Sequence, residues 1–170
     1  MNNVNVSELG KFFSAVKENP SQAKKNKSVT GVWVFEEGKP QFVSTIEYPK
    51  GKVVFNTELP SFAGGWGTSP DPIQYCLHGL ASCFAATLVA TAAAENIELK
   101  KLEVTAENWM DLRKQLGLSE ENIIERVKFT VRAEGPSRDT LDRLLVLTKE
   151  RCPGVECLTR AVPLEVELKT

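Results

Sequence analysis

The feature that most constrains the fold is the run Ile73–Ala94, which contains no Asp, Glu, Lys or Arg. Its length passes the threshold of about 18 residues for a membrane-spanning helix. The run is rich in alanine, is interrupted by Gln74, His78 and several hydroxyl side chains, and lacks the basic flank and aromatic belt of a spanning helix. We therefore expect a buried central helix in a globular protein rather than a membrane span.

Residues suited to helix termini mark both ends of this run. Asp71 is a candidate cap, Pro72 fits the first helical position, and Gln74 completes a capping box. Asn96 is the expected stop, because asparagine tolerates the left-handed conformation. An apolar helix of this length needs cover on all sides. A sheet covers one side, and a second copy of the chain is the simplest cover for the other.

Hydrophobic periodicity predicts strands and further helices around this run. The predicted strands are Val29–Glu36, Gln41–Tyr48, Gly51–Thr57, Leu99–Glu107, Ile123–Glu134 and Val162–Leu168. The other predicted helices are Ser7–Asn19 and a second core helix from Ser137 to Arg151, which Pro153-Gly154 ends. Leu59–Pro70 is expected to be a mobile loop bordering a pocket, and Trp109–Leu118 a short helix or loop. This order predicts an α+β fold in which sheets pack around two core helices.

Length and charge narrow the class of protein. A chain of 170 residues favours a single domain over 1–170, with an N-terminal helix and linker over 1–28 and the core over 29–170. Lys plus Arg is 21 and Asp plus Glu is 22, which gives no electrostatic case for binding nucleic acid or an anionic membrane. The cluster Lys24, Lys25 and Lys27 is typical of a solvated loop. His78 is the single histidine, so sites with two histidine ligands are excluded.

The cysteines are the first candidates for chemistry. The N-terminal segment has neither a basic start nor an apolar run, so we expect a cytoplasmic protein. Structural disulfides are rare in that compartment, where cysteines are buried, metal-bound or redox-active. The four are Cys76, Cys83, Cys152 and Cys157. Their spacing does not match a zinc ribbon, and we expect no metal and no cofactor.

Cys83 lies in the middle of the central helix, and Cys152 lies at the end of the second core helix. If the two meet, one thiolate attacks a peroxide oxygen to form a sulfenic acid, and the other thiol condenses with it to a disulfide. The alternative is that both are small core residues, as free cysteines often are. Cys76 and Cys157 are expected to be bystanders, and His78 a satisfied or pocket-lining side chain. No serine-hydrolase motif or specific carboxylate pair is present.

Two cysteine motifs carry a resemblance to a known family. They are Ser69-Pro70-Asp71-Pro72-Ile73-Gln74-Tyr75 followed by Leu80-Ala81-Ser82-Cys83-Phe84, and Glu150-Arg151-Cys152-Pro153. The segments Asp111-Leu112-Arg113 through Gly117-Leu118 and Val162-Pro163-Leu164-Glu165-Val166 agree in order and distance. From about Val29 to its end, the chain resembles the OsmC/Ohr family of osmotically inducible protein C and organic hydroperoxide resistance proteins.

The resemblance implies an α+β fold built as an intertwined homodimer with the long helices at its centre. It implies a thiol peroxidase in which Cys83 attacks a hydroperoxide, Cys152 resolves the sulfenic acid, and an external dithiol regenerates both thiols. Peroxidase members place a Glu ten residues before the attacking cysteine, where this chain has Ile73. They also use an Arg from the N-terminal strands, whereas every arginine here lies at Arg113 or later.

These departures keep two other functions open. One is a non-catalytic protein of the same fold that binds a small hydrophobic ligand at the dimer interface. The other is a thiol redox sensor whose disulfide alters an interaction. A thiol buried among apolar side chains without a neighbouring cation is expected to have a raised pKa and to react slowly.

Overall fold

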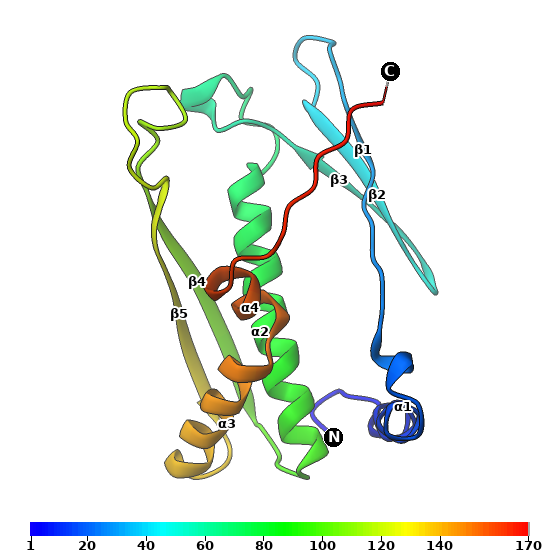
Figure 1. Cartoon of the computed structure of the whole chain (residues 1–170). Coiled ribbons are helices and arrows are strands. Elements are labelled where there is room, and N and C mark those ends of the chain that lie inside the picture. Colours follow the sequence, from blue (N-terminus) through cyan, green and yellow to red (C-terminus); the bar gives the residue numbers. More distant parts are fainter. Residues whose placement is uncertain (170) are drawn as a thin grey trace. The chain divides into compact units, whose positions relative to one another are not determined.

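The computed structural model describes residues 1–169, which form two compact units. One unit comprises Met1–Ser14 together with the chain from Leu77 onward, and the other is Ala15–Cys76. The chain passes between them in the helices α1 (Val6–Glu18) and α2 (Pro72–Ala94). Figure 1 gives the order of the elements along the chain.

The smaller unit is built on an antiparallel meander of three strands. These are β1 (Gly31–Trp33), β2 (Phe42–Tyr48) and β3 (Gly51–Thr57), hydrogen-bonded in that order. The β2–β3 pair runs from Phe42 opposite Thr57 to Tyr48 opposite Gly51, so a tight turn joins the two strands. β2 and β3 agree closely with the predicted segments, while β1 is shorter than predicted.

The loop between β3 and α2 is fastened by two side chains. The buried carboxylate of Glu58 accepts hydrogen bonds from the Thr68 hydroxyl and, at 3.2 Å, from the Thr68 N–H. The Thr68 hydrogen bond holds the pKa of Glu58 below its usual range. Gln41 donates to the carbonyl of Gly64 at 3.0 Å and accepts from the N–H of Leu59 at 2.8 Å. The loop was expected to be mobile and to border a pocket, but it lines neither of the two described cavities.

The predicted capping box starts α2. The N–H of Gln74 donates to the Asp71 carboxylate at 2.9 Å, and the Gln74 side chain accepts from the Asp71 N–H at 3.0 Å. At the other end, Asn96 adopts the left-handed conformation with φ 58°. Both helix signals found in the sequence are therefore confirmed. Although α2 is long and apolar enough to span a membrane, it is a partly buried core helix, with Phe84, Leu88, Thr91, Ala92 and Ala93 buried.

The larger unit packs helices against a two-stranded antiparallel sheet. The strands are β4 (Lys101–Met110) and β5 (Ile124–Glu134), which run alongside α2 (Figure 1). The helices α3 (Arg138–Arg151) and α4 (Pro153–Thr159) follow. Phe84, Leu88, Cys152 and Val155 form the core cluster of this unit. The inward side chains Leu102, Val104, Phe129 and Val131 pack against that cluster.

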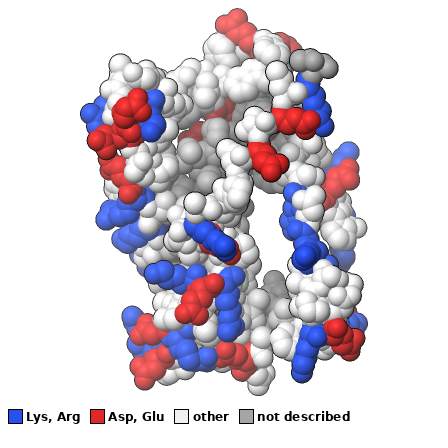
Figure 2. All heavy atoms as spheres, viewed as in Figure 1, with Lys and Arg blue, Asp and Glu red and all other residues white. Residues whose placement is uncertain are grey.

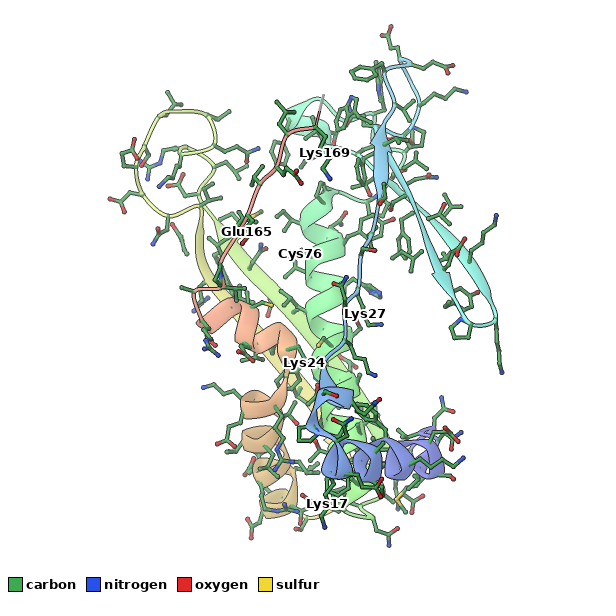
Figure 3. All side chains as sticks on the ribbon, turned by 45° about the vertical axis from the view of Figure 1, so that its right-hand side comes forward. Lys17, Lys24, Lys27, Cys76, Glu165 and Lys169 are labelled. Carbon is green, nitrogen blue, oxygen red and sulfur yellow. The ribbon has the colours of Figure 1, made fainter. Side chains whose placement is uncertain are left out.

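Within the larger unit, the side chain of Asn2 links the N-terminal segment to the chain that follows α2. Asn2 donates to the carbonyl of Ile97 at 2.8 Å and accepts from the N–H of Leu99 at 2.9 Å. Beyond α1, Lys24 and Lys27 are exposed, as expected for a solvated loop (Figure 3). On the face drawn in Figure 2, acidic and basic side chains are interspersed. This distribution agrees with the near-zero net charge.

Two predicted boundaries need correction. Pro153-Gly154 was expected only to end a helix, but it also begins α4, because proline is favoured at the first helical position. The segment predicted as a short helix or loop from Trp109 starts two residues later, because Trp109 and Met110 belong to β4, and residues 111–123 form a loop of turns.

Val162–Leu168 was predicted as a strand, and this prediction is wrong for the single chain. The segment forms no strand within residues 1–169. A strand requires a neighbour that supplies ladder hydrogen bonds, and the sheet of the larger unit contains only β4 and β5. Alternate side chains of the segment are left exposed, including Leu164 at 86% and Val166 at 88%.

Candidate active site

The structure brings Cys83 and Cys152 together. Cys83 lies in the middle of α2, and Cys152 lies at the junction of α3 and α4. Their sulfur atoms are 3.6 Å apart, and the Cys152 thiol donates a hydrogen bond to the Cys83 sulfur. Cys152 is 2% exposed, whereas Cys83 is half-buried. Closure of this pair to a disulfide therefore requires a small movement of the two side chains.

Gly154 lets the start of α4 approach α2 at this point. A Cβ atom at Gly154 would lie 3.3 Å from the Leu80 side chain and 3.6 Å from the Cys83 sulfur. The backbone N–H of Gly154 donates a hydrogen bond to that sulfur. The site is therefore made of two thiols and one backbone donor, which belong to α2 and to the α3–α4 junction.

The electrostatics of the site favour the protonated form of the Cys83 thiol. Burial is the largest effect and raises the pKa of Cys83, while the Gly154 hydrogen bond lowers it. The contact with the Cys152 thiol, and the charges that Cys152 and Cys157 carry when ionised, raise the pKa of Cys83 further. No basic side chain is among the groups that mainly determine the pKa of Cys83. The raised pKa agrees with the expectation drawn from the absent arginine.

The raised pKa predicts a steep pH dependence of Cys83 reactivity. The thiolate is the nucleophile, and below the pKa its fraction rises about tenfold for each pH unit. The rate of Cys83 alkylation by iodoacetamide is therefore expected to rise about tenfold per unit between about pH 7 and 9. Peptide mass analysis of a Cys76→Ser variant measures this rate without interference from Cys76. A plateau reached below about pH 8 would contradict the raised pKa.

The larger unit has a cavity of about 800 Å³, which core neighbours of the thiol pair line but Cys83 and Cys152 do not. Its apolar lining includes Phe84, Phe129 and Val155, which are also core residues. Cys157 and Lys149 contribute polar groups to its wall. A cavity of this size is typical of small-molecule sites.

The remaining candidate residues lie outside the thiol pair. Cys76 is exposed in the first turns of α2 (Figure 3), and His78 is exposed and lines neither described cavity. Gln74, next to the position of the family glutamate, is engaged in the capping box. Among residues 1–169, no group of three or more His, Cys, Asp or Glu side chains is placed to hold a metal ion.

The sequence did not predict the contact of the Gly154 N–H with the Cys83 sulfur or the position of Cys157. Gly154 was assigned a helix-ending role, because a Pro-Gly pair is a general breaker signal. Nothing local in the sequence indicates that its N–H faces a sulfur atom on another helix. Cys157 was expected to be a bystander, yet it lines the cavity together with the core residues Phe84 and Val155.

The fold and the site define an α+β protein with a paired-thiol site between two of its helices. Residues 65–167 match the family model described as OsmC-like protein, which covers more than half of the chain. The chain belongs to the OsmC-like protein family. The resemblance noted from the two cysteine motifs is confirmed.

Solved structures of this family have the same fold. An organic hydroperoxide resistance protein OsmC from Legionella pneumophila is 19% identical, with a TM-score of 0.59 over 81% of this chain and 91% of that one. The organic hydroperoxide resistance protein OhrB of Bacillus subtilis is 22% identical, with a TM-score of 0.54 over 85% and 98%. A Vibrio cholerae protein with captopril bound in one of its active sites is 17% identical, with a TM-score of 0.56 over 81% and 88%. No curated protein matches the chain.

Proposed function

We propose that this protein is a thiol peroxidase that reduces organic or inorganic hydroperoxides with Cys83 and Cys152. The observation that carries the proposal is the 3.6 Å separation of the two sulfur atoms. Cys83 is the more exposed of the two and can meet a substrate, whereas Cys152 is buried behind it. That asymmetry suits an attacking thiol and a resolving thiol.

The reaction has two steps on the protein. The Cys83 thiolate attacks the outer peroxide oxygen, the O–O bond breaks, and the alcohol leaves after taking a proton, so that Cys83 becomes a sulfenic acid. The Cys152 sulfur then attacks the Cys83 sulfur, water leaves, and a disulfide forms. An external dithiol reduces the disulfide to two thiols and completes the cycle.

The chain lacks the Glu and the Arg that peroxidase members of the family use, so we expect the attack of Cys83 on the peroxide to be slow. Here the Gly154 N–H is the group that stabilises a Cys83 thiolate, because the leading influences on its pKa include no cation. One neutral hydrogen-bond donor stabilises a thiolate less than a guanidinium does. The proposal therefore predicts a slow peroxidase at neutral pH.

The deciding experiment treats the reduced protein with one equivalent of cumene hydroperoxide or hydrogen peroxide and follows its thiols by peptide mass analysis. We expect a Cys83–Cys152 disulfide to form within seconds to minutes. The Cys76→Ser variant, which removes an exposed thiol seven residues before Cys83 on the same helix, serves as the control and should behave alike. If both thiols remain reduced for hours, the peroxidase proposal is wrong.

A homodimer accounts for the exposed C-terminal segment. Val162, Leu164, Val166 and Leu168 are 59–88% exposed and alternate along the chain. A strand with one apolar face needs both a ladder partner and a surface to cover. A second copy supplies both, and sedimentation of the protein at micromolar concentration tests this. A monomer at that concentration would contradict the proposal.

The cavity favours a second candidate function, the binding of a small hydrophobic ligand. Its volume of about 800 Å³ and its apolar lining suit such a molecule. This candidate predicts a rise in melting temperature with an added apolar ligand, and no consumption of peroxide.

The redox chemistry proposed for Cys83 and Cys152 also favours a reducing compartment, so we place the protein in the cytoplasm.

A further inference from the structure

A third thiol lies near the proposed pair. Cys157 is on α4, five residues after Cys152, and it lines the cavity together with Phe84 and Val155. Phe84 is adjacent to Cys83 in α2, and the charge of an ionised Cys157 reaches far enough to raise the pKa of Cys83. Cys157 differs from both members of the pair because it is exposed.

Exposure matters for the reductive half of the cycle. An external dithiol must bring its sulfur into line with a sulfur of the disulfide, so the exchange rate depends on access. Cys152 is 2% exposed and Cys83 is half-buried, so a disulfide between them offers little surface to a large reductant. A neighbouring exposed thiol can attack the buried disulfide and form a new disulfide that is accessible at the surface.

We propose that Cys157 is the third member of a thiol relay that moves the oxidised bond from Cys83–Cys152 to Cys152–Cys157. The inference rests on the proposed peroxidase function. The Cys157 thiolate attacks the Cys152 sulfur, a Cys152–Cys157 bond forms, and the bond to Cys83 breaks. Cys83 leaves as a thiolate and takes up the proton that Cys157 lost, so one disulfide is exchanged for another. The external dithiol then reduces the exposed bond.

The exchange requires the first turn of α4 to open. Five helical residues rise by about 7.5 Å, which exceeds the limit of about 7 Å between the Cα atoms of a disulfide. The first turn is held by the hydrogen bond from the Glu156 N–H to the Cys152 carbonyl, at 3.0 Å.

Two features of α4 lower the free energy needed to open its first turn. The helix has only seven residues, and its second residue is Gly154, whose backbone has more conformational freedom than that of other residues. Val155 and Cys157 both line the adjacent cavity, which leaves space for this part of α4 to move.

The disulfide connectivity of the oxidised protein tests the relay. The Cys76→Ser variant, with three thiols, is oxidised with one equivalent of cumene hydroperoxide, quenched with acid over time and blocked with N-ethylmaleimide. Trypsin cuts after Arg151 and Arg160, and a glutamate-specific protease cuts after Glu156. Only a Cys152–Cys157 bond holds the fragments 152–156 and 157–160 together without Cys83. We expect Cys83–Cys152 first, followed by Cys152–Cys157 as the main form.

A second arm separates failure of the relay from failure of the peroxidase. The same variant is oxidised with diamide, which makes disulfides without a peroxide step, and the same two fragments are sought. Cys152–Cys157 should form in this arm even if peroxide leaves every thiol reduced. A Cys83–Cys152 bond that never moves to Cys157 in either arm overturns the relay and leaves the peroxidase proposal intact.

Reduction kinetics give an independent readout. In a Cys76→Ser/Cys157→Ser variant, the Cys83–Cys152 disulfide should be reduced by thioredoxin about tenfold more slowly than in Cys76→Ser alone. A small phosphine reductant should reduce both at similar rates, because it does not depend on the relay. Equal rates with thioredoxin would show that Cys157 carries no exchange.

Discussion

Replacing Cys83 with serine is expected to abolish hydroperoxide consumption down to the uncatalysed rate. A serine hydroxyl stays protonated at neutral pH and forms no sulfenic acid, so the first step is lost. The measurement is the loss of cumene hydroperoxide with excess dithiothreitol present. Cys76→Ser, which removes another cysteine of the same helix, should retain the full rate. Unchanged turnover in Cys83→Ser would remove the basis of the proposed function.

The Cys152→Ser variant should fail in a different way. Its Cys83 can still attack peroxide, but no thiol stands 3.6 Å away to condense with the sulfenic acid. Excess peroxide then oxidises Cys83 further along the ladder, first to the sulfinic and then to the sulfonic acid. Intact mass should show two and then three added oxygen atoms, whereas the protein with both cysteines shows the loss of two hydrogen atoms. The two variants together therefore assign the attacking and the resolving thiol.

The largest expected effect on stability comes from Leu144→Ala. Leu144 is 0% exposed on α3, two turns before Cys152. Truncating a fully buried leucine removes burial and leaves a cavity, which costs about 2–5 kcal/mol of unfolding free energy. Val146→Ala on the same helix is the control, because Val146 is 58% exposed and its loss should change that free energy by less than about 0.5 kcal/mol.

Urea denaturation at one fixed protein concentration measures both variants, since a dimer makes apparent stability depend on concentration. A loss below about 1 kcal/mol for Leu144→Ala would mean that the packing around α3 adjusts readily to the lost side chain. The comparison bears on function because α3 ends at Cys152. A loosened α3 should also slow formation of the Cys83–Cys152 disulfide.

Much of the local structure is predictable from the sequence, because its signals are local. The capping box of Asp71 and Gln74 and the stop at Asn96 involve residues within a few positions of each other. The strands β2, β3 and β5 follow from alternation along one segment. The two cysteine motifs also carry the family resemblance without any spatial information.

The predictions that failed depend on what surrounds a segment. Val162–Leu168 alternates like a strand, but alternation reports only which side chains share a face. Whether the segment becomes a strand depends on a neighbour, and the described single chain supplies none. Pro153-Gly154 is ambiguous in the same way, because proline both ends one helix and starts another.

The sequence by itself determined the central helix, the core faces of the strands and the family to which the chain belongs. Only the tertiary structure decided that two thiols separated by 69 positions lie 3.6 Å apart, with the Gly154 N–H beside one of them and Cys157 in the wall of a cavity that Phe84 also lines. The reason is physical. Periodicity specifies which face of an element is buried, whereas the packing of distant elements against one another selects the residues that meet there.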